Sequence, residues 1–303
     1  MYISIGSIIV DDIVLPDGET RMGMFGGGST HAIAGMKVWA DEIGIAAWVG
    51  HNLPTEMEAE LRRNFDLAGV VRRDLPTPRA WQLFETDGRR IEIFRTDMQE
   101  FIRNSPRPEE LPEHYWSATG VHYQNDIHNL PEWVAKFRAH GSGPVLWEPW
   151  GEVTIPENRG LFRSLMPLVD AISPNLLEGQ NLTGLQDAEA IAAALLEDGA
   201  RMVVLRMGSE GSLSMDREGQ VVRVPPTPPA RIVDVTGAGN AFCGGFVVGL
   251  AETGSMLQAA CMGSVSASFT LEQFGAMYPF ENIRPRAQER LDALLPLASC
   301  GRR

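Results

Sequence analysis

The 303-residue chain is poor in cysteine, and its cysteines follow no metal-binding spacing. They are Cys243, Cys261 and Cys300, an odd number without a C-x-x-C pair. Such a set gives no cysteine zinc site and is typical of a reducing compartment. No signal peptide precedes the first apolar segment, so we expect a cytoplasmic protein.

Basic charge is also scarce. The formal net charge is −13, and lysine occurs only at Lys37 and Lys136. Nucleic acids and anionic membranes are bound by basic surfaces, so neither is expected as a partner. The negative net charge does not exclude a nucleotide as a ligand, because a local turn can hold its phosphates. No apolar run approaches the ~20 residues of a membrane span. The glycine–lysine loop of Walker A, H-E-x-x-H and G-x-S-x-G are all missing, which argues against a hydrolase.

The order of the apolar segments predicts an α/β fold. Residues Tyr2 to Val10 are almost uniformly apolar, as in an interior strand of a parallel sheet. From residue 115 onward strands alternate with helices, which indicates a doubly wound, mostly parallel sheet. We therefore expect a single α/β domain over residues 1–303. Strands are predicted at 118–123, 144–147, 170–173, 202–205, 212–215, 221–224 and 230–234, and helices at 131–140, 161–168, 188–198, 241–250, 256–272 and 285–294.

Two hairpin patterns near the amino terminus predict a small β lid. In the first, Pro16-Asp17-Gly18 forms the turn. In the second, Trp81 and Leu83 alternate with polar neighbours before a turn at Asp87-Gly88. The lid strands would be inserted near residues 12–24 and 79–96.

The most informative segment is Asp234 to Phe242 (DVTGAGNAF). Its glycines allow several backbone N–H groups to converge, and the following helix adds the positive end of its dipole. Residues 237–239, here called the cradle, would hold a phosphoryl group during transfer. Gly244, Gly245 and Gly249 interrupt the helix and predict close packing against a neighbour, since glycine costs a helix about 1 kcal/mol relative to alanine.

Five elements in order resemble the PfkB, or ribokinase-like, carbohydrate kinases over nearly the whole chain. They are Gly6 to Asp11, Gly26 to His31 (GGGSTH), Ser173 to Glu178 with Leu182-Thr183-Gly184, Val203 to Gly211 (VVLRMGSEG), and Asp234 to Asn240. A closer resemblance is to the fungal maintenance-of-killer branch, carried by Gly26-Gly27-Gly28, Trp147-Glu148-Pro149 and Gly239-Asn240.

The resemblance implies a role for each matching residue. Asp11, Gly27, Gly28 and His31 would bind substrate, and Trp81 is a guess at the same surface, with Phe84 and Phe94. Asn175, Arg206, Gly208 and Gly211 would bind nucleotide, and Glu178 would hold Mg²⁺ through water. Gly237, Ala238, Gly239 and Asn240 would be catalytic.

Several of these residues have a purely structural alternative. Asp11 could cap a turn, Asn175 could cap the helix that follows it, and Arg206 could be a solvated side chain. Asp234 could bind near the substrate, support a monovalent cation or cap its own turn. His31 replaces the family's asparagine, and a capping or packing role is open for it too.

Asn240 is the larger departure, because the family has an aspartate there that accepts the proton of the attacking hydroxyl. An amide cannot take a proton, but it can orient a hydroxyl through its carbonyl oxygen. General-base catalysis contributes ~10²–10⁴-fold, so its loss predicts a slow enzyme. Asp11, Asp12 and Glu148 are candidate replacement bases.

Two functions are therefore predicted. The first is an ATP- and Mg²⁺-dependent kinase for a hydroxyl of a sugar, polyol or nucleoside, with a homodimer formed through the lid. The predicted kinase could also bind a monovalent cation as a cofactor. The alternative is an impaired relative that binds nucleotide or sugar as a sensor without turnover.

Overall fold

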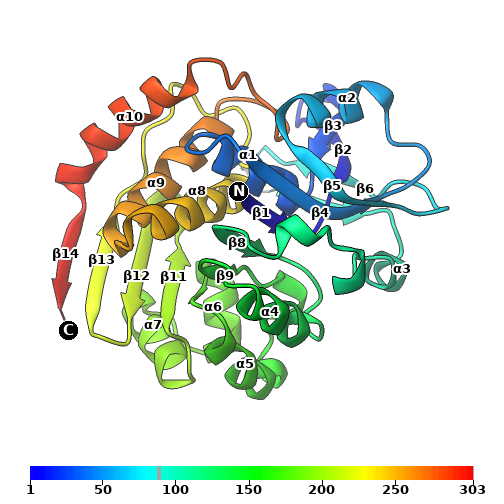
Figure 1. Cartoon of the computed structure of the whole chain (residues 1–303). Helices are drawn as coiled ribbons and strands as arrows, with labels where there is room; N and C mark the ends of the chain where they lie inside the picture. Colours follow the sequence, from blue (N-terminus) through cyan, green and yellow to red (C-terminus); the bar gives the residue numbers. More distant parts are fainter. Residues whose placement is uncertain (87–89, 303) are drawn as a thin grey trace.

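The computed structural model describes residues 1–86 and 90–302, which form a ten-stranded and a four-stranded sheet (Figure 1). The larger sheet has the order β14-β13-β12-β11-β10-β9-β8-β1-β4-β5. Neighbouring strands are parallel from β5 to β11 and antiparallel from β11 to β14. The predicted mostly parallel, doubly wound α/β fold is confirmed. The strands are β1 Tyr2–Ile5, β4 Ile43–Val49, β5 Asp66–Arg72, β8 Gly120–Tyr123, β9 Val145–Trp147, β10 Ala171–Ile172, β11 Met202–Arg206, β12 Ser212–Asp216, β13 Gln220–Val224 and β14 Ser299–Arg302.

Helices cover both faces of this sheet and create two hydrophobic cores (Figure 1). Strand β11 contributes to both, because successive side chains point to opposite faces. Val204 lies in the first core, and Val203 and Leu205 lie in the second. The first core contains α1 Gly28–Lys37, α2 Thr55–Asn64, α8 Ala238–Thr253, α9 Met256–Thr270 and α10 Ile283–Leu294, and the second contains α4 Leu130–Ala139, α5 Arg159–Leu165, α6 Leu176–Thr183 and α7 Ala188–Glu197.

Helices α1 and α8 cross almost backbone to backbone, as the glycines of the second helix predicted. A Cβ added to Gly244 would lie 2.0 Å from the carbonyl oxygen of Ala32. One added to Gly35 would lie 2.2 Å from that of Ala241. This crossing brings the amino-terminal turns of the two helices together at the carboxyl edge of the sheet.

Because of this contact, Gly244→Ala is expected to lower the free energy of unfolding by about 1–3 kcal/mol, as overpacked cores do. Urea unfolding measures the change. The matched control is Gly160→Ala in α5, where an added Cβ meets nothing within 4 Å. That substitution is expected to stabilise the helix by up to about 1 kcal/mol, because alanine is the better helix former. Equal changes in the free energy of unfolding for Gly244→Ala and Gly160→Ala would contradict the close crossing of α1 and α8.

The four-stranded sheet has the order β3-β2-β6-β7 and stands beside the larger one (Figure 1). Its strands are β2 Ile9–Val14, β3 Thr20–Gly26, β6 Arg79–Phe84 and β7 Arg90–Phe94, and helix α3 Met98–Arg103 follows β7. They lie near residues 12–24 and 79–96, where the lid strands are predicted. The predicted strand from Tyr2 to Val10 is wrong in one respect. It is broken between Ile5 and Ile9, so Asp11 lies in the small sheet. The predicted turn at Asp87-Gly88 falls outside the described residues.

Other differences from the sequence predictions are local. The segment 230–234 is not a strand but an irregular stretch before the cradle. Strands β4, β5 and β14 and helices α2 and α3 had no predicted counterpart. None of the helices formed by the described residues has the length and apolar character needed to span a bilayer.

Candidate active site

A cavity of about 1250 Å³ lies between the small sheet and the carboxyl edge of the large one. Asp11 and His31 line it from the amino-terminal half, and Gly237 to Asn240 line it from α8. Glu148 and Asn175 reach it just beyond β9 and β10. Ligands of doubly wound folds bind at this edge of the sheet. The cradle therefore lines the same cavity as Asp11.

The cradle begins α8 with an uncapped turn. Gly237 is the N-cap residue in the left-handed conformation, with φ 75°, and no side chain caps the helix. Among the described residues, the N–H groups of Gly237, Gly239 and Asn240 have no hydrogen-bond acceptor. Unpaired N–H groups at the start of a 16-residue helix form an anion site.

Beside the cradle, Glu148 is the centre of a buried polar network. Its Oε1 lies 2.6 Å from Nη1 of Arg206, and its Oε2 accepts a hydrogen bond of 2.8 Å from Nε2 of His122. The other ring nitrogen of His122 is 2.8 Å from Ser4 Oγ. The Asn240 amide lies near enough to Glu148 to help stabilise its negative charge. Asn240 thus stands next to a carboxylate.

Glu148 is ionised despite its burial. Burial raises the pKa of this carboxyl, but the charge of Arg206 and the hydrogen bonds from His122 and Asn240 outweigh it and lower the pKa to about 2. Both oxygens are engaged by cations or donors. These contacts make Glu148 a poor candidate for the replacement base that the sequence suggested.

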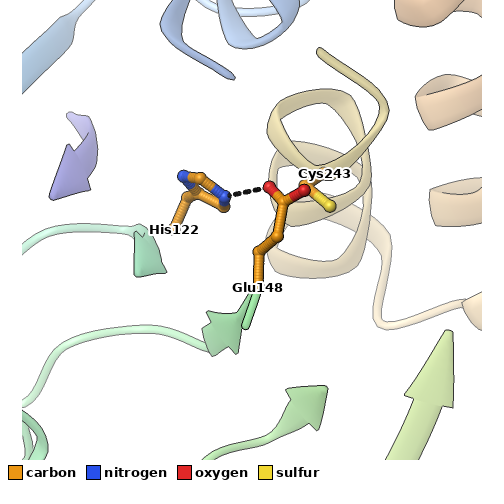
Figure 2. Close-up of side chains that lie close together, drawn as sticks. All are labelled: His122, Glu148 and Cys243. Atoms are coloured by element: carbon orange, nitrogen blue, oxygen red, sulfur yellow. Dashed lines mark hydrogen bonds and ion pairs between the residues drawn. The ribbon is translucent and has the colours of Figure 1, made fainter. Parts of the chain in front are cut away.

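His122, Glu148 and Cys243 are grouped closely enough to hold a metal ion (Figure 2). Burial raises the pKa of the Cys243 thiol, so it is protonated, and its sulfur donates to Ser173 Oγ at 3.4 Å. Arg206 already supplies the positive charge that Glu148 requires. The cluster fits an internal ion pair better than a metal centre.

Asp11 and Asp12 occupy opposite environments although they are adjacent. Asp12 is fully buried and bound by two arginines, with Arg79 Nη2 at 2.7 Å and Arg95 Nη1 at 2.8 Å. It does not line the cavity, which excludes it as the base. Asp11 lines the cavity, and among the described residues its side chain accepts one hydrogen bond, of 3.3 Å from Gln82. Burial raises the pKa of Asp11 to about 7.

The raised pKa of Asp11 predicts a change in stability with pH. The folded state binds this proton more tightly than the unfolded chain, so the contribution of Asp11 falls as pH rises from about 4 to about 7. Asp11→Asn should remove this loss of folding stability. The raised pKa corresponds to a loss on the order of 4 kcal/mol above pH 7. Urea unfolding at pH 5 and pH 8 measures it. A variant no more stable than wild type at pH 8 would contradict the buried-acid account.

His31 is buried against the cradle. A Cβ added to Gly237 would lie 2.1 Å from its ring, and neither ring nitrogen has a hydrogen-bond partner among the described residues. Burial, with a smaller contribution from the nearby charge of Arg90, lowers the pKa of His31 to about 3. The imidazole is therefore neutral. It caps nothing, since the N-cap of α1 is Gly27.

Asn175 and Glu178 form the capping box of α6. Asn175 Oδ1 accepts from the Glu178 N–H at 2.8 Å, and Glu178 Oε2 accepts from the Asn175 N–H at 2.7 Å. The capping alternative for Asn175 is therefore what the structure contains. Both residues also line the cavity, as do Arg206, Gly208 and Gly211. Burial raises the pKa of Glu178.

Of the other three residues predicted to bind substrate, two line the cavity and one does not. Gly27 and Gly28 line the cavity, but Trp81 does not. Trp81 packs against Arg95, whose Cζ lies 4.9 Å from its ring centroid. Its neighbour Gln82 lines the cavity instead, because alternate residues of β6 face opposite sides. Sequence reasoning also missed a group of cavity-lining residues that no motif marks: Gln82, Arg90, Glu92, Phe101, Gln124 and Trp150.

Asp234 is buried outside the cavity lining. Its Oδ1 accepts a 2.7 Å hydrogen bond from the Thr236 N–H, which is the turn-capping alternative. Oδ2 has no partner among the described residues, and burial raises the pKa of the carboxyl.

Comparisons with known proteins agree with this geometry. The sequence model described as pfkB family carbohydrate kinase matches residues 128–283. The cytidine kinase of Thermococcus kodakarensis is 26% identical over 89% of this chain and 96% of its own. Protein MAK32 of Saccharomyces cerevisiae is 32% identical over 43% of this chain and 42% of its own. The crystal structure of adenosine kinase from Sinorhizobium meliloti has a TM-score of 0.79 and 18% identity, covering 95% of this chain and 98% of that one.

Proposed function

Because the chain belongs to the pfkB family of carbohydrate kinases and resembles its maintenance-of-killer branch, we propose that it transfers the γ-phosphoryl group of ATP to an alcohol hydroxyl. The observation that carries this proposal is the uncapped cradle opening into the same cavity as Asp11. Asp11 would hold the acceptor hydroxyls, and the cradle N–H groups would bind the phosphoryl group in transfer. Glycine at 237 lets the cradle turn adopt φ 75° with the His31 ring packed directly against it.

ATP and Mg²⁺ fit the residues beyond the cradle. The nucleotide would lie against two other groups of cavity-lining residues, which are Gly208, Ser209 and Gly211, and Pro226 to Pro229 with Ile232. Glu178 is the carboxylate that would hold Mg²⁺ through water, a coordination that Mg²⁺ prefers. The ion would neutralise charge on the phosphates. A monovalent cation near Asp234 stays a prediction.

The acceptor side of the cavity favours a nucleoside over a bare sugar or polyol. Phe94 and Phe101 pack edge to face with centroids 5.0 Å apart, and Trp150 lies 6.0 Å from Phe101. All three line the cavity. An aromatic wall offers a flat base a stacking surface that a polyol would not use. Gln82, Arg90 and Gln124 supply polar contacts beside it.

The second candidate function is that of a binding protein without turnover. It is favoured by the amide at Asn240, which cannot accept the proton of an acceptor hydroxyl. An amide is suited to this position, since it helps to stabilise the ionised Glu148 beside it. Asn240→Asp is expected to give no gain in kcat, because the new carboxyl would face Glu148 and its pKa would be raised. The exchange variant Asn240→Asp/Glu148→Gln restores one acid and one amide and should be more active than Asn240→Asp. Radiometric assays measure both, and a large gain from Asn240→Asp alone would contradict this reasoning.

The deciding experiment is a panel of acceptors incubated with [γ-³²P]ATP and Mg²⁺. Adenosine, cytidine, ribose, fructose and glycerol cover nucleosides, sugars and polyols. We expect label in a phosphomonoester of at least one nucleoside. Nucleotide binding by calorimetry without labelled product from any acceptor would favour the binding protein.

The small sheet would act as the lid of this site and as a surface for a homodimer. Ile91 and Ile93 on β7 and Met22 on β3 are large apolar side chains exposed by 41, 47 and 53%. Ile93→Glu should shift a dimer toward monomer in sedimentation velocity. A wild-type monomer at all concentrations would contradict the dimer.

A further inference from the structure

Arg206 ends strand β11 with its guanidinium against the cradle. A Cβ added to Gly239 would lie 2.2 Å from its Nη1, so this nitrogen occupies the space next to the cradle backbone. The residue lines the cavity, and its side chain is 12% exposed. The sequence alternative of a solvated surface arginine is wrong.

The guanidinium is held by three neighbouring residues and keeps N–H donors that they do not use. Nη1 contacts Glu148, and Nη2 donates to the Ser173 carbonyl at 2.9 Å and lies 3.5 Å from Glu178 Oε2. A guanidinium has five N–H donors. The Nε–H has no acceptor among the described residues, and Nη1 keeps a second N–H bond. The contacts fix the plane of the group without using all of its hydrogen-bonding capacity.

We propose that Arg206 is a catalytic residue that donates hydrogen bonds to the phosphoryl group while it moves from ATP to the acceptor. The proposal rests on the phosphotransfer function above and names a residue that performs it. Positive charge at this point stabilises the equatorial oxygens of a loose transition state, as arginines supplied to phosphoryl-transfer sites do. Because Glu148, Ser173 and Glu178 already orient the guanidinium, no reorganisation is needed during the reaction.

The step balances without a base at position 240. The acceptor oxygen forms its bond to the γ-phosphorus as the bond from that phosphorus to the β–γ bridging oxygen breaks and ADP leaves. The hydroxyl proton moves to a nonbridging oxygen of the transferred phosphoryl group and is later lost to water. In a loose transition state this proton leaves late, so a side chain that accepts it contributes less than charge stabilisation. An arginine at the cradle is thus consistent with an amide at Asn240.

The competing explanation is that Arg206 only neutralises the buried Glu148. A single substitution cannot separate the two, because removing Arg206 alone leaves Glu148 unpaired. The test therefore uses Arg206→Ala/Glu148→Gln, which removes both charges together. Phosphoryl transfer from [γ-³²P]ATP to adenosine, cytidine and ribose is measured with and without millimolar methylguanidinium, and thermal melting checks the fold.

We expect the double variant to remain folded and to lose kcat by about 10²–10³-fold, the usual effect of removing a donor to a transition-state oxyanion. Methylguanidinium should enter the vacated space and restore at least tenfold. Arg206→Lys should lie between wild type and the double variant. A kcat within threefold of wild type would overturn the proposal, and so would a loss that methylguanidinium does not relieve. If wild type itself transfers no label, the proposed function fails, and this inference fails with it.

Discussion

Arg206→Met is expected to destabilise the protein by about 3–5 kcal/mol, because it leaves the carboxylate of Glu148 buried without its cation. Glu148 is only 2% exposed and is held at 2.6 Å by the arginine. His122 and Asn240 remain as donors, but neither brings the full charge of the guanidinium. Equilibrium unfolding in urea at pH 7 measures the change.

Two variants make this expectation specific. Arg206→Met/Glu148→Gln should recover much of the lost stability, since a well-packed neutral pair often matches a buried ion pair. Arg62→Met is the matched surface control, because Arg62 is 68% exposed and pairs with Glu58 at 2.9 Å. An exposed pair of this kind contributes ~0–1 kcal/mol. A loss from Arg206→Met as small as that from Arg62→Met would mean that the pair is not buried in solution.

Gly237→Ala should reduce phosphoryl transfer by at least about 10²–10³-fold, the effect of losing one donor to the transition state. Gly237 has a backbone φ of 75°, a conformation that residues with a Cβ rarely adopt. An added Cβ would also lie 2.1 Å from the His31 ring. The backbone must rotate or the ring must move, and either displaces the cradle N–H groups. Steady-state kinetics with the acceptor found in the panel measure the loss.

The control for backbone strain is Gly184→Ala. Gly184 has φ 76° at the end of α6, and an added Cβ there meets nothing within 4 Å. Its conformational cost should match that of Gly237→Ala, while kcat should be unchanged. Equal losses of kcat in both variants would indicate that general destabilisation, and not the cradle, is being measured.

Sequence predicted best those features that contiguous residues determine. The glycines and helix start at 237–241 lie in one segment, and their local conformation follows from residue type. The α6 capping box joins Asn175 and Glu178, three positions apart, although the sequence had offered capping by Asn175 only as an alternative. The break after Ile5 was not visible, because apolar residues continue through it and both parts are buried.

Features that depend on register or distant contacts could not be obtained in this way. Trp81 and Gln82 differ only in the face of β6 on which they lie, and a bulky aromatic was the natural guess for a substrate surface. The Glu148 network joins Glu148, which follows β9, to residues from β8, β11 and α8 that are far apart in sequence. Its members carry no common motif, although Trp147-Glu148-Pro149 had drawn attention to one of them.

The surroundings of Asn240 and His31 explain why these two residues can replace the ones that the family usually has. Asn240 is matched to an ionised carboxylate that would repel an aspartate. His31 is a neutral ring packed on Gly237, where the family has an amide. Both replacements keep the cavity polar without adding charge to its inner wall.

The most direct test is a single turnover with enzyme in excess over [γ-³²P]ATP and a saturating acceptor. Wild type should pass the label completely to a phosphomonoester, while Gly237→Ala binds ATP with similar affinity and leaves the label in place. If ATP and acceptor both bind wild type and the label still remains in ATP, residues 237–239 are not a phosphotransfer site.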